Sequence, residues 1–151
     1  MDSRLAHPFT CIVSVPTGSR KSLFTLKVIE HARENISPCY GEYKKIFDNY
    51  PGVYFHDGLP DLSSFDGKKR TLLVIDDLMT STDDRAIDIF TKISHNRNLS
   101  VVYLTQNLFY KNKQTRALSL NSHYIVLFKN AREATHVANL VHHMYPVKVH
   151  L

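Results

Sequence analysis

Cysteines and long apolar runs are scarce in this sequence, and each shortage excludes a class of protein. The 151 residues include two cysteines, Cys11 and Cys39, whose separation does not match a metal-binding pair. Such usage indicates reduced thiols in an intracellular protein rather than a disulfide-built scaffold. No apolar run approaches the ~20 residues that cross a bilayer. The N-terminal MDSRLAHPF lacks the apolar core of a signal peptide, so we expect a soluble protein with no membrane partner.

The overall composition is ordinary and predicts a globular domain. Hydrophobic residues make up 43% of the chain and charged residues 22%, as in typical soluble proteins. A length of 151 residues fits one domain, 1–151, that needs no disulfide or metal to be stable. The net charge of +5 is compatible with a nucleic-acid partner, but it is weak evidence because many basic proteins bind none.

Apolar runs and helical patterns alternate along the chain. Strands are predicted over 9–15, 53–56, 71–76, 100–105 and 123–128. Helices are predicted over 21–34, over 83–96 and from Asn130 onward to Pro146. Long crossovers separate most of the strands, so the pattern predicts an α/β fold with a mostly parallel five-stranded sheet covered on both faces.

The remaining segments are predicted from weaker signals. The segment 35–51 favours a loop or short helix, and 106–120 favours a basic, polar loop. In the last helix Asn130 and Glu133 form a capping pair. Its inner face is predicted to consist of Ala134, Val137, Val141 and Met144.

The loop after the first apolar strand has the layout of a phosphate-binding loop. Lys21 is placed to reach the β- and γ-phosphates of ATP, and Ser22 is placed to ligate Mg²⁺. The helix that follows presents unpaired backbone N–H groups to the phosphates. The register of the motif is Val15, Pro16, Thr17, Gly18, Ser19, Arg20, Lys21 and Ser22.

Both glycines of this motif are replaced, the first by Val15 and the second by Arg20. Glycine adopts positive φ without strain and lets the backbone approach a ligand closely. A valine forced into such a conformation costs of order 1–3 kcal/mol. We therefore expect weaker nucleotide binding than at an intact loop. Taken alone, Lys21-Ser22 after a strand fits a loop with no ligand equally well.

The strand over 71–76 ends in two acids, Asp76 and Asp77. Carboxylates are costly in an apolar sheet unless they bind something, and at the carboxyl ends of parallel strands they face the crevice where ligands bind. Asp76 is predicted to hold Mg²⁺, and Asp77 to polarise the attacking water as general base. The simpler alternative is a helix cap or a solvated strand end.

Two further polar groups follow later strands. Gln106 comes directly after the strand over 100–105 and is predicted to sense the γ-phosphate or orient water. Arg116 is predicted to stabilise phosphoryl transfer from a neighbouring subunit. An ordinary polar strand end and a solvated surface arginine are the alternatives, and Arg116 with Lys111 and Lys113 could instead contact DNA phosphates.

These stretches together resemble one family. The chain is similar to the FtsK/HerA superfamily, and more closely to the genome-packaging ATPases of polinton- or adintovirus-like mobile elements and their viral relatives. The resemblance covers about residues 8–133, and its last two stretches are more specific than the first, because short phosphate-loop motifs are common. The matching stretches read VPTGSRKSLF, TLLVIDDLM, SVVYLTQNLF and RALSLNSHYIVLFKNARE.

The resemblance implies a P-loop NTPase three-layer sandwich with strand order 5-1-4-3-2, in which Gln106 lies between the phosphate and Asp77. It implies ATP and Mg²⁺ as cofactors, with nucleotide roles for Lys21, Ser22, Asp76, Asp77 and Gln106. Arg116 is then the candidate arginine that acts in trans.

As partners the resemblance implies double-stranded DNA, copies of the same chain in a ring, and capsid proteins. Such a ring pumps DNA into a capsid where virions assemble, in the host nucleus or cytoplasm.

Other readings remain open at this point. Loss of the motif glycines favours a catalytically impaired pseudo-ATPase kept as a binding or scaffold subunit. A decayed, truncated copy of a mobile element would explain both that loss and the short chain. A small-molecule kinase is a third candidate, but it predicts an arginine-rich lid and an acceptor pocket, and neither is clear in the sequence.

Overall fold

The computed structural model describes residues 5–16, 21–33, 39–41, 53–55, 59–61, 63, 65, 67–76, 87–93, 98–106, 108–109 and 113–144. Within these residues six strands form one sheet in the order β3-β2-β4-β5-β1-β6, and every pair of neighbours is parallel. The strands are β1 (Thr10–Ser14), β2 (Cys39–Gly41), β3 (Val53–Phe55), β4 (Thr71–Asp76), β5 (Leu99–Thr105) and β6 (Tyr124–Leu127).

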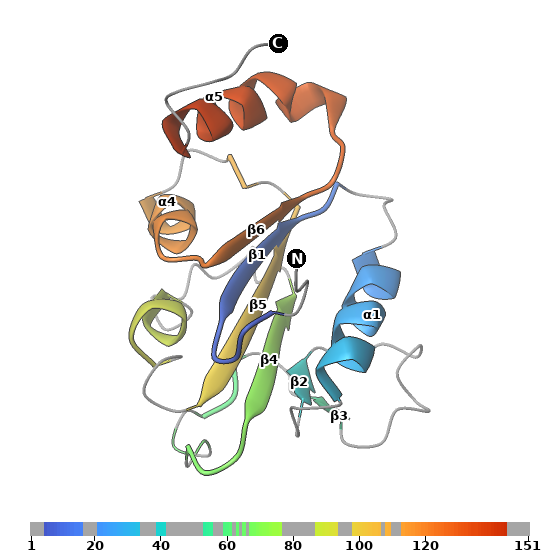
Figure 1. The fold of residues 1–151 in the computed structure, drawn as a ribbon, viewed down its shortest axis with the longest axis vertical. Coiled ribbons are helices and arrows are strands. Elements are labelled where there is room, and N and C mark those ends of the chain that lie inside the picture. Colours follow the sequence, from blue (N-terminus) through green and yellow to red (C-terminus); the bar gives the residue numbers. More distant parts are fainter. Residues whose placement is uncertain are drawn as a thin grey trace.

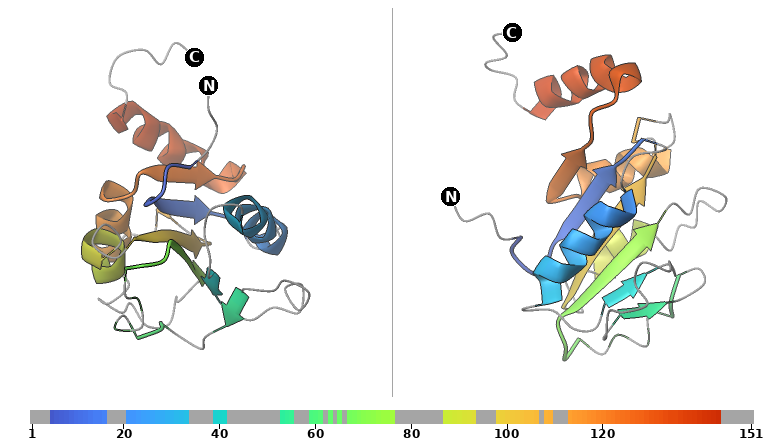
Figure 2. Two further views of the ribbon diagram at one scale, coloured as in Figure 1. Left: turned by 60° about the horizontal axis from the view of Figure 1, so that its bottom comes forward. Right: turned by 90° about the vertical axis from the view of Figure 1, so that its right-hand side faces the viewer.

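Helices cover both faces of the sheet. Helix α1 (Lys21–Arg33) lies on one face, while the π-helical segment η3 (Ile89–Ile93) and helix α4 (Lys113–Leu120) lie on the other (Figures 1 and 2). The 3₁₀ turn η4 (Ala131–Glu133) and helix α5 (Ala134–Met144) follow the edge strand β6. The described elements therefore form helix, sheet and helix layers, as the alternating pattern predicts.

Two apolar clusters hold these layers together, one on each face of the sheet. Alternate residues of β1 point to opposite faces, so Val13 packs in the cluster with Ile29 of α1 and Ile12 in the cluster with Phe90 of η3. All five residues of β1 are buried. This explains why a near-continuous apolar run, rather than an alternating one, forms the central strands.

The sheet differs from the sequence prediction in its number of strands. Strand β2 lies in the segment 35–51, which was predicted as a loop or short helix, so the prediction of five strands is wrong and the described sheet has six. Without β2, the five predicted strands follow the order β6-β1-β5-β4-β3, which is 5-1-4-3-2 in their own numbering. Strand β2 is inserted between β4 and β3, where it pairs with both.

The helices agree with the prediction in part. Helix α1 is confirmed, and residues 87–93 of the predicted helix 83–96 are helical, the rest lying outside the described residues. The prediction of a loop over 106–120 is wrong, since α4 occupies Lys113–Leu120. No helix in the described part of the chain is long and apolar enough to span a membrane.

Asn130 is a cap as predicted, although it caps the 3₁₀ turn η4 before α5 and no side-chain contact with Glu133 is seen, and the predicted inner face of α5 is not buried. The Asn130 side chain accepts a hydrogen bond from the Arg132 backbone N–H at 3.1 Å. No residue of α5 is buried, and Val141 and Met144 are 38% and 54% exposed. The predicted burial of this face is therefore wrong for the described part of the chain. An apolar stripe marks a helix face suited to packing, but it does not supply the element that packs on it.

Candidate functional site

The carboxyl ends of the central strands meet at one edge of the sheet, which we call the carboxyl edge. In the register of the ladders Ser14 of β1 pairs with Thr105 of β5, and Asp76 of β4 pairs with Leu104. Parallel strands that end together bring whatever follows them to the same place. Asp76, Gln106 and the start of α1 therefore belong to one edge, although they are far apart in the sequence.

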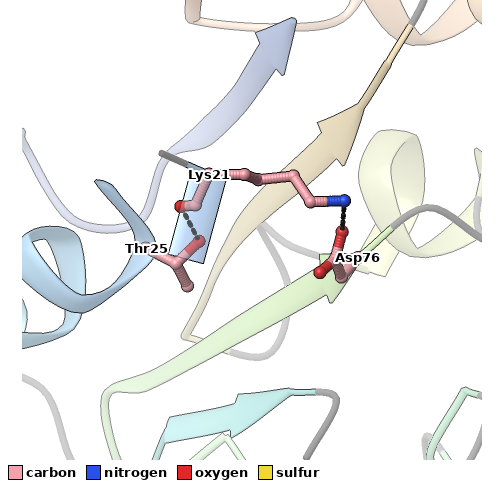
Figure 3. A network of polar contacts seen from close by, with 3 residues as sticks. All are labelled: Lys21, Thr25 and Asp76. Carbon is pink, nitrogen blue, oxygen red and sulfur yellow. Dashed lines mark hydrogen bonds and ion pairs between the residues drawn. The ribbon is translucent and has the colours of Figure 1, made fainter. Parts of the chain in front are cut away.

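An ion pair crosses this edge between Lys21 and Asp76. The Lys21 side chain extends from the first turn of α1 toward the end of β4, and its Nζ lies 2.5 Å from Oδ1 of Asp76 (Figure 3). The two side chains are 20% and 5% exposed. The structure thus brings together the lysine of the first motif and the first acid of the second motif, as the sequence predicts.

Local packing fixes where the lysine starts from. Helix α1 begins at Lys21, and the hydroxyl of Thr25 donates to the Lys21 carbonyl at 3.0 Å (Figure 3). Thr25 is itself buried. The Thr25–Lys21 bond lies within the helix and closes its first turn, which carries no acidic residue. This turn leaves backbone N–H groups without intrahelical partners at the same edge as the ion pair.

A buried ion pair of this kind is not explained by stability. Removing two charges from water costs several kcal/mol per ion, and an apolar pair of similar volume is often equally stable or more so. Asp76 terminates a strand whose other five residues, Thr71 to Ile75, are buried. The position of this carboxylate and ammonium makes the carboxyl edge the candidate functional site.

Val15 is not strained, which corrects the expectation drawn from the missing glycine. It extends β1 by one position, since its backbone N–H donates to the Thr105 carbonyl at 2.9 Å. Its side chain is fully buried in the apolar cluster on the α1 face of the sheet, together with Val13 and Ile29. Among the described residues other than glycine, only Asn98 has positive φ. The position therefore continues the hydrogen bonding of β1 to β5 without a positive φ, and a buried valine suits it.

Gln106 lies at the carboxyl edge, directly after β5 and two residues beyond Leu104, the partner of Asp76. Its side chain is half-buried. Leu108 is buried in the apolar cluster on the sheet face of η3. The Phe109 ring stacks on His136 of α5, with 5.4 Å between the ring centroids. Gln106 therefore stands at the carboxyl edge, between β5 and residues that pack against apolar and aromatic neighbours.

The other predicted site residues stand apart from the pair or cannot be placed. Arg116 is exposed on α4, on the sheet face opposite α1, so it lies on a helix and not in the predicted loop. Pro16 is half-buried after β1, and Ser22 lies in the first turn of α1 without a described side chain. The residues Thr17, Gly18, Ser19, Arg20 and Asp77 lie outside the described part of the chain.

The opposite edge of the sheet, which we call the amino edge, carries polar contacts that the sequence analysis missed. His7 Nδ1 lies 2.5 Å from Ser100 Oγ, and His7 Nε2 lies 2.8 Å from Asn98 Oδ1. Ser100 Oγ also accepts from the Phe9 backbone N–H at 3.1 Å. Serine, histidine and asparagine in contact resemble a nucleophilic triad, but Ser100 is fully buried and cannot meet a substrate.

A second tie at the amino edge joins β1 to the start of β6. The Thr10 backbone N–H donates to His123 Nδ1 at 3.0 Å, and the Thr10 hydroxyl donates to the Asn121 carbonyl at 3.0 Å. These contacts join residues more than 100 positions apart in the sequence. No local motif could have revealed them, because each depends on which strands become neighbours.

Within the described residues no group of three or more His, Cys, Asp or Glu side chains could hold a metal ion. Mg²⁺ at a nucleotide site is bound by one or two protein oxygens together with phosphates and waters, and Asp76 with a phosphate fits that chemistry. No protein-family model matches the chain, and no match was found among curated proteins or solved structures.

Proposed function

We propose that this chain is an ATPase domain of the P-loop type that binds Mg²⁺–ATP at the carboxyl edge. The observation that carries the proposal is the contact between Lys21 and Asp76, two groups from separate motifs that are 2.5 Å apart. One is the cation that such sites place on the phosphates, and the other is the acid that they place near the metal.

In this proposal each group has a defined task. Lys21 and the backbone N–H groups of the first turn of α1 bind the triphosphate. Asp76 and Ser22 hold Mg²⁺, which neutralises charge on the phosphates when it is bound. Asp77 accepts a proton from the attacking water, and Gln106 orients that water. Arg116 acts in the site of a neighbouring subunit, which fits its exposure on α4.

Two features of the structure support a P-loop sandwich. Strand β5 lies between β1, which leads into α1, and β4, which ends in Asp76. This arrangement puts Gln106 at the edge between the two motifs. Val15 also extends β1 without strain, so the loss of the first motif glycine does not count against nucleotide binding as heavily as the sequence implied.

The motif resemblance supports a more specific role, as a motor that moves double-stranded DNA into a capsid as part of a homo-oligomeric ring. The net charge of +5 is compatible with a DNA partner. The alternative is a scaffold subunit that has lost hydrolysis. Arg20, which replaces the second motif glycine, favours that alternative because it adds bulk beside Lys21.

The first test is titration of the chain with fluorescent ATP in the presence of Mg²⁺. Lys21→Ala should weaken binding by about a hundredfold, because the ammonium–phosphate contact is charge-assisted and largely shielded from water. Lys27→Ala is the matched control, since Lys27 is an exposed lysine on the same helix and its loss should not change affinity. Thermal unfolding should confirm that both variants are folded.

Turnover then separates the two candidates. An ATPase motor should hydrolyse ATP and do so faster with double-stranded DNA. Binding that depends on Lys21, without any turnover, favours the scaffold subunit. Absence of ATP binding by the folded wild-type chain at millimolar concentration contradicts the proposed function altogether.

A further inference from the structure

We propose that the outer side of β6 is a docking site for residues 147–151 of the same chain, which add a further parallel strand between β6 and α5. This segment lies outside the described residues, and its sequence is VKVHL. The proposal does not depend on the nucleotide site. It is carried by two surfaces of the described structure that one strand would cover together, the outer side of β6 and the apolar stripe of α5.

The outer side of β6 is its long side away from β1. Strand β6 is at one end of the described sheet, where β1 is its neighbour. The Phe128 N–H donates to the Ser14 carbonyl of β1 at 3.0 Å. Successive residues of a strand turn their backbone groups to opposite edges, so Val126 also faces β1, whereas Ile125 and Leu127 face the outer side. This side therefore presents backbone donors and acceptors to which an extended strand can bind.

The sequence of β6 is typical of an interior strand rather than an edge strand. Its residues are YIVL, and the stretch 117–128 contains no Asp, Glu, Lys, Arg or Pro. Natural edge strands are commonly protected from unwanted pairing by lysine, by proline or by being very short. All four residues of β6 are half-buried, whereas all five residues of the neighbouring β1 are buried. This contrast indicates that a further strand belongs beside β6.

Helix α5 provides a second apolar surface near the same edge. It contains no Asp, Glu, Lys or Arg, and yet none of its residues is buried. Val137 is half-buried, and Val141 and Met144 are 38% and 54% exposed. A helix of this composition is normally covered by other parts of a protein. It lies beyond β6, on the side away from β1 (Figures 1 and 2), so a strand added to β6 would also contact α5.

The path of the chain leads residues 147–151 to this place. Helix α5 runs back from the end of β6 toward the side on which β6 begins (Figures 1 and 2). The residues after Met144, 145–151, reach at most about 25 Å when extended. Residues 128–146 would connect the two strands, and they exceed the dozen or so residues that a parallel crossover needs. The added strand would therefore run parallel to β6.

The sequence of the segment is typical of an edge strand. Apolar and polar residues alternate along VKVHL, and this period of two favours a strand that is buried on one face. Pro146 precedes it, and Lys148 is a residue that discourages pairing with yet another strand. A second copy of the chain fits the outer side less well, because its whole sheet would have to pass α5 (Figure 2).

Backbone amide exchange, measured by NMR on the full chain, tests the proposal. In the wild type the amides of Ile125 and Leu127 should be protected. Val149→Asp places a charge on the apolar face of the segment, and it should make these two amides exchange at least about tenfold faster. His150→Asp is the matched control, because it introduces the same residue on the opposite face. It should leave the protection of both amides unchanged.

The amide of Ile12, which is buried in β1, reports whether each variant is folded and should stay protected in all of them. Val147→Asp repeats the test two positions earlier on the apolar face. Rapid exchange of Ile125 and Leu127 in the wild type overturns the proposal, and so does an unchanged rate in both aspartate variants of the apolar face. Protection that rises with protein concentration overturns it as well, because a second copy would then supply the strand.

Discussion

The two edges of the sheet use polar groups in opposite ways. At the amino edge neutral groups satisfy one another: Ser100 accepts from the Phe9 backbone, and Thr10 donates to His123 and to a carbonyl. At the carboxyl edge an ammonium and a carboxylate face each other with little access to water. The contacts at the amino edge connect segments that are far apart in the sequence. The ion pair at the carboxyl edge holds two buried charges, although two apolar side chains of similar volume would stabilise the fold about equally well.

This difference shows how to separate structural from functional polar groups. A buried neutral hydrogen bond contributes modestly but is costly to leave half-made, about 1–3 kcal/mol. Its presence is therefore explained by the fold. A buried ion pair has no such explanation, because desolvation cancels much of its attraction. The amino edge should therefore respond to mutation in stability alone, and the carboxyl edge in ligand binding as well.

The largest expected effect tests whether Val15 belongs to the structural or the functional part of the carboxyl edge. Val15→Gly should lower the free energy of unfolding by about 3 kcal/mol, from the loss of a fully buried side chain and the added freedom of glycine. Denaturant unfolding measures this. Restoring the motif glycine at this position alone should therefore weaken the protein.

Val13→Gly is the matched control, because Val13 is also fully buried in β1 and lies in the same cluster. The two variants should lose similar stability if Val15 is a strand residue. A gain in stability for Val15→Gly, beside a large loss for Val13→Gly, would show that position 15 prefers a glycine conformation in solution and would restore the original expectation of strain.

Much of the sheet could be predicted because burial on both faces leaves a plain signal. The runs FTCIVSV, TLLVID and SVVYLT have few polar positions, and a run of that kind has few alternatives to a central parallel strand. The convergence of Lys21 and Asp76 followed from the same logic, since both come after such strands. That they would bind each other directly did not follow, because spacing gives proximity and not side-chain contact.

The errors have a common cause in tertiary context. The three residues of β2 carry no apolar run, and the strand exists through its pairing with β3 and β4. Helix α4 has a sequence, KQTRALSL, with no acidic residue in its first turn to indicate a start. The apolar stripe on α5 is present, but none of the residues of this helix is buried as the stripe predicted. Short elements and helix faces depend on neighbours that a local pattern does not contain.

The next effect in size concerns the amino edge. Ser100→Ala should lower the free energy of unfolding by about 2 kcal/mol, because it leaves the buried Phe9 N–H without an acceptor and releases His7. ATP affinity should stay at the wild-type value. Ser119→Ala is the control: this hydroxyl donates to the Arg116 carbonyl on an exposed helix, and its loss should cost under about 0.5 kcal/mol. A Ser100→Ala protein with normal stability but weaker ATP binding would contradict the separation of the two edges.

The smallest effect lies between the edges, at Cys11 in β1. Burial raises the pKa of the Cys11 thiol to about 12 from 9.0, because the sheet interior disfavours a thiolate. Between these values the unfolded chain loses this proton while the folded chain keeps it. Stability from this group is therefore complete below pH 9 and declines as the pH rises toward 12, with a slope of up to about 1.4 kcal/mol per pH unit.

The comparison with Cys11→Ala isolates this contribution, since the lysines and tyrosines titrate in both proteins. Unfolding curves at about pH 8 and pH 10 should show the wild type losing about 1 kcal/mol more stability than the variant. Parallel losses would mean that water reaches the thiol. The interior of the sheet at Cys11 would then be open to water, contrary to the burial of that side chain.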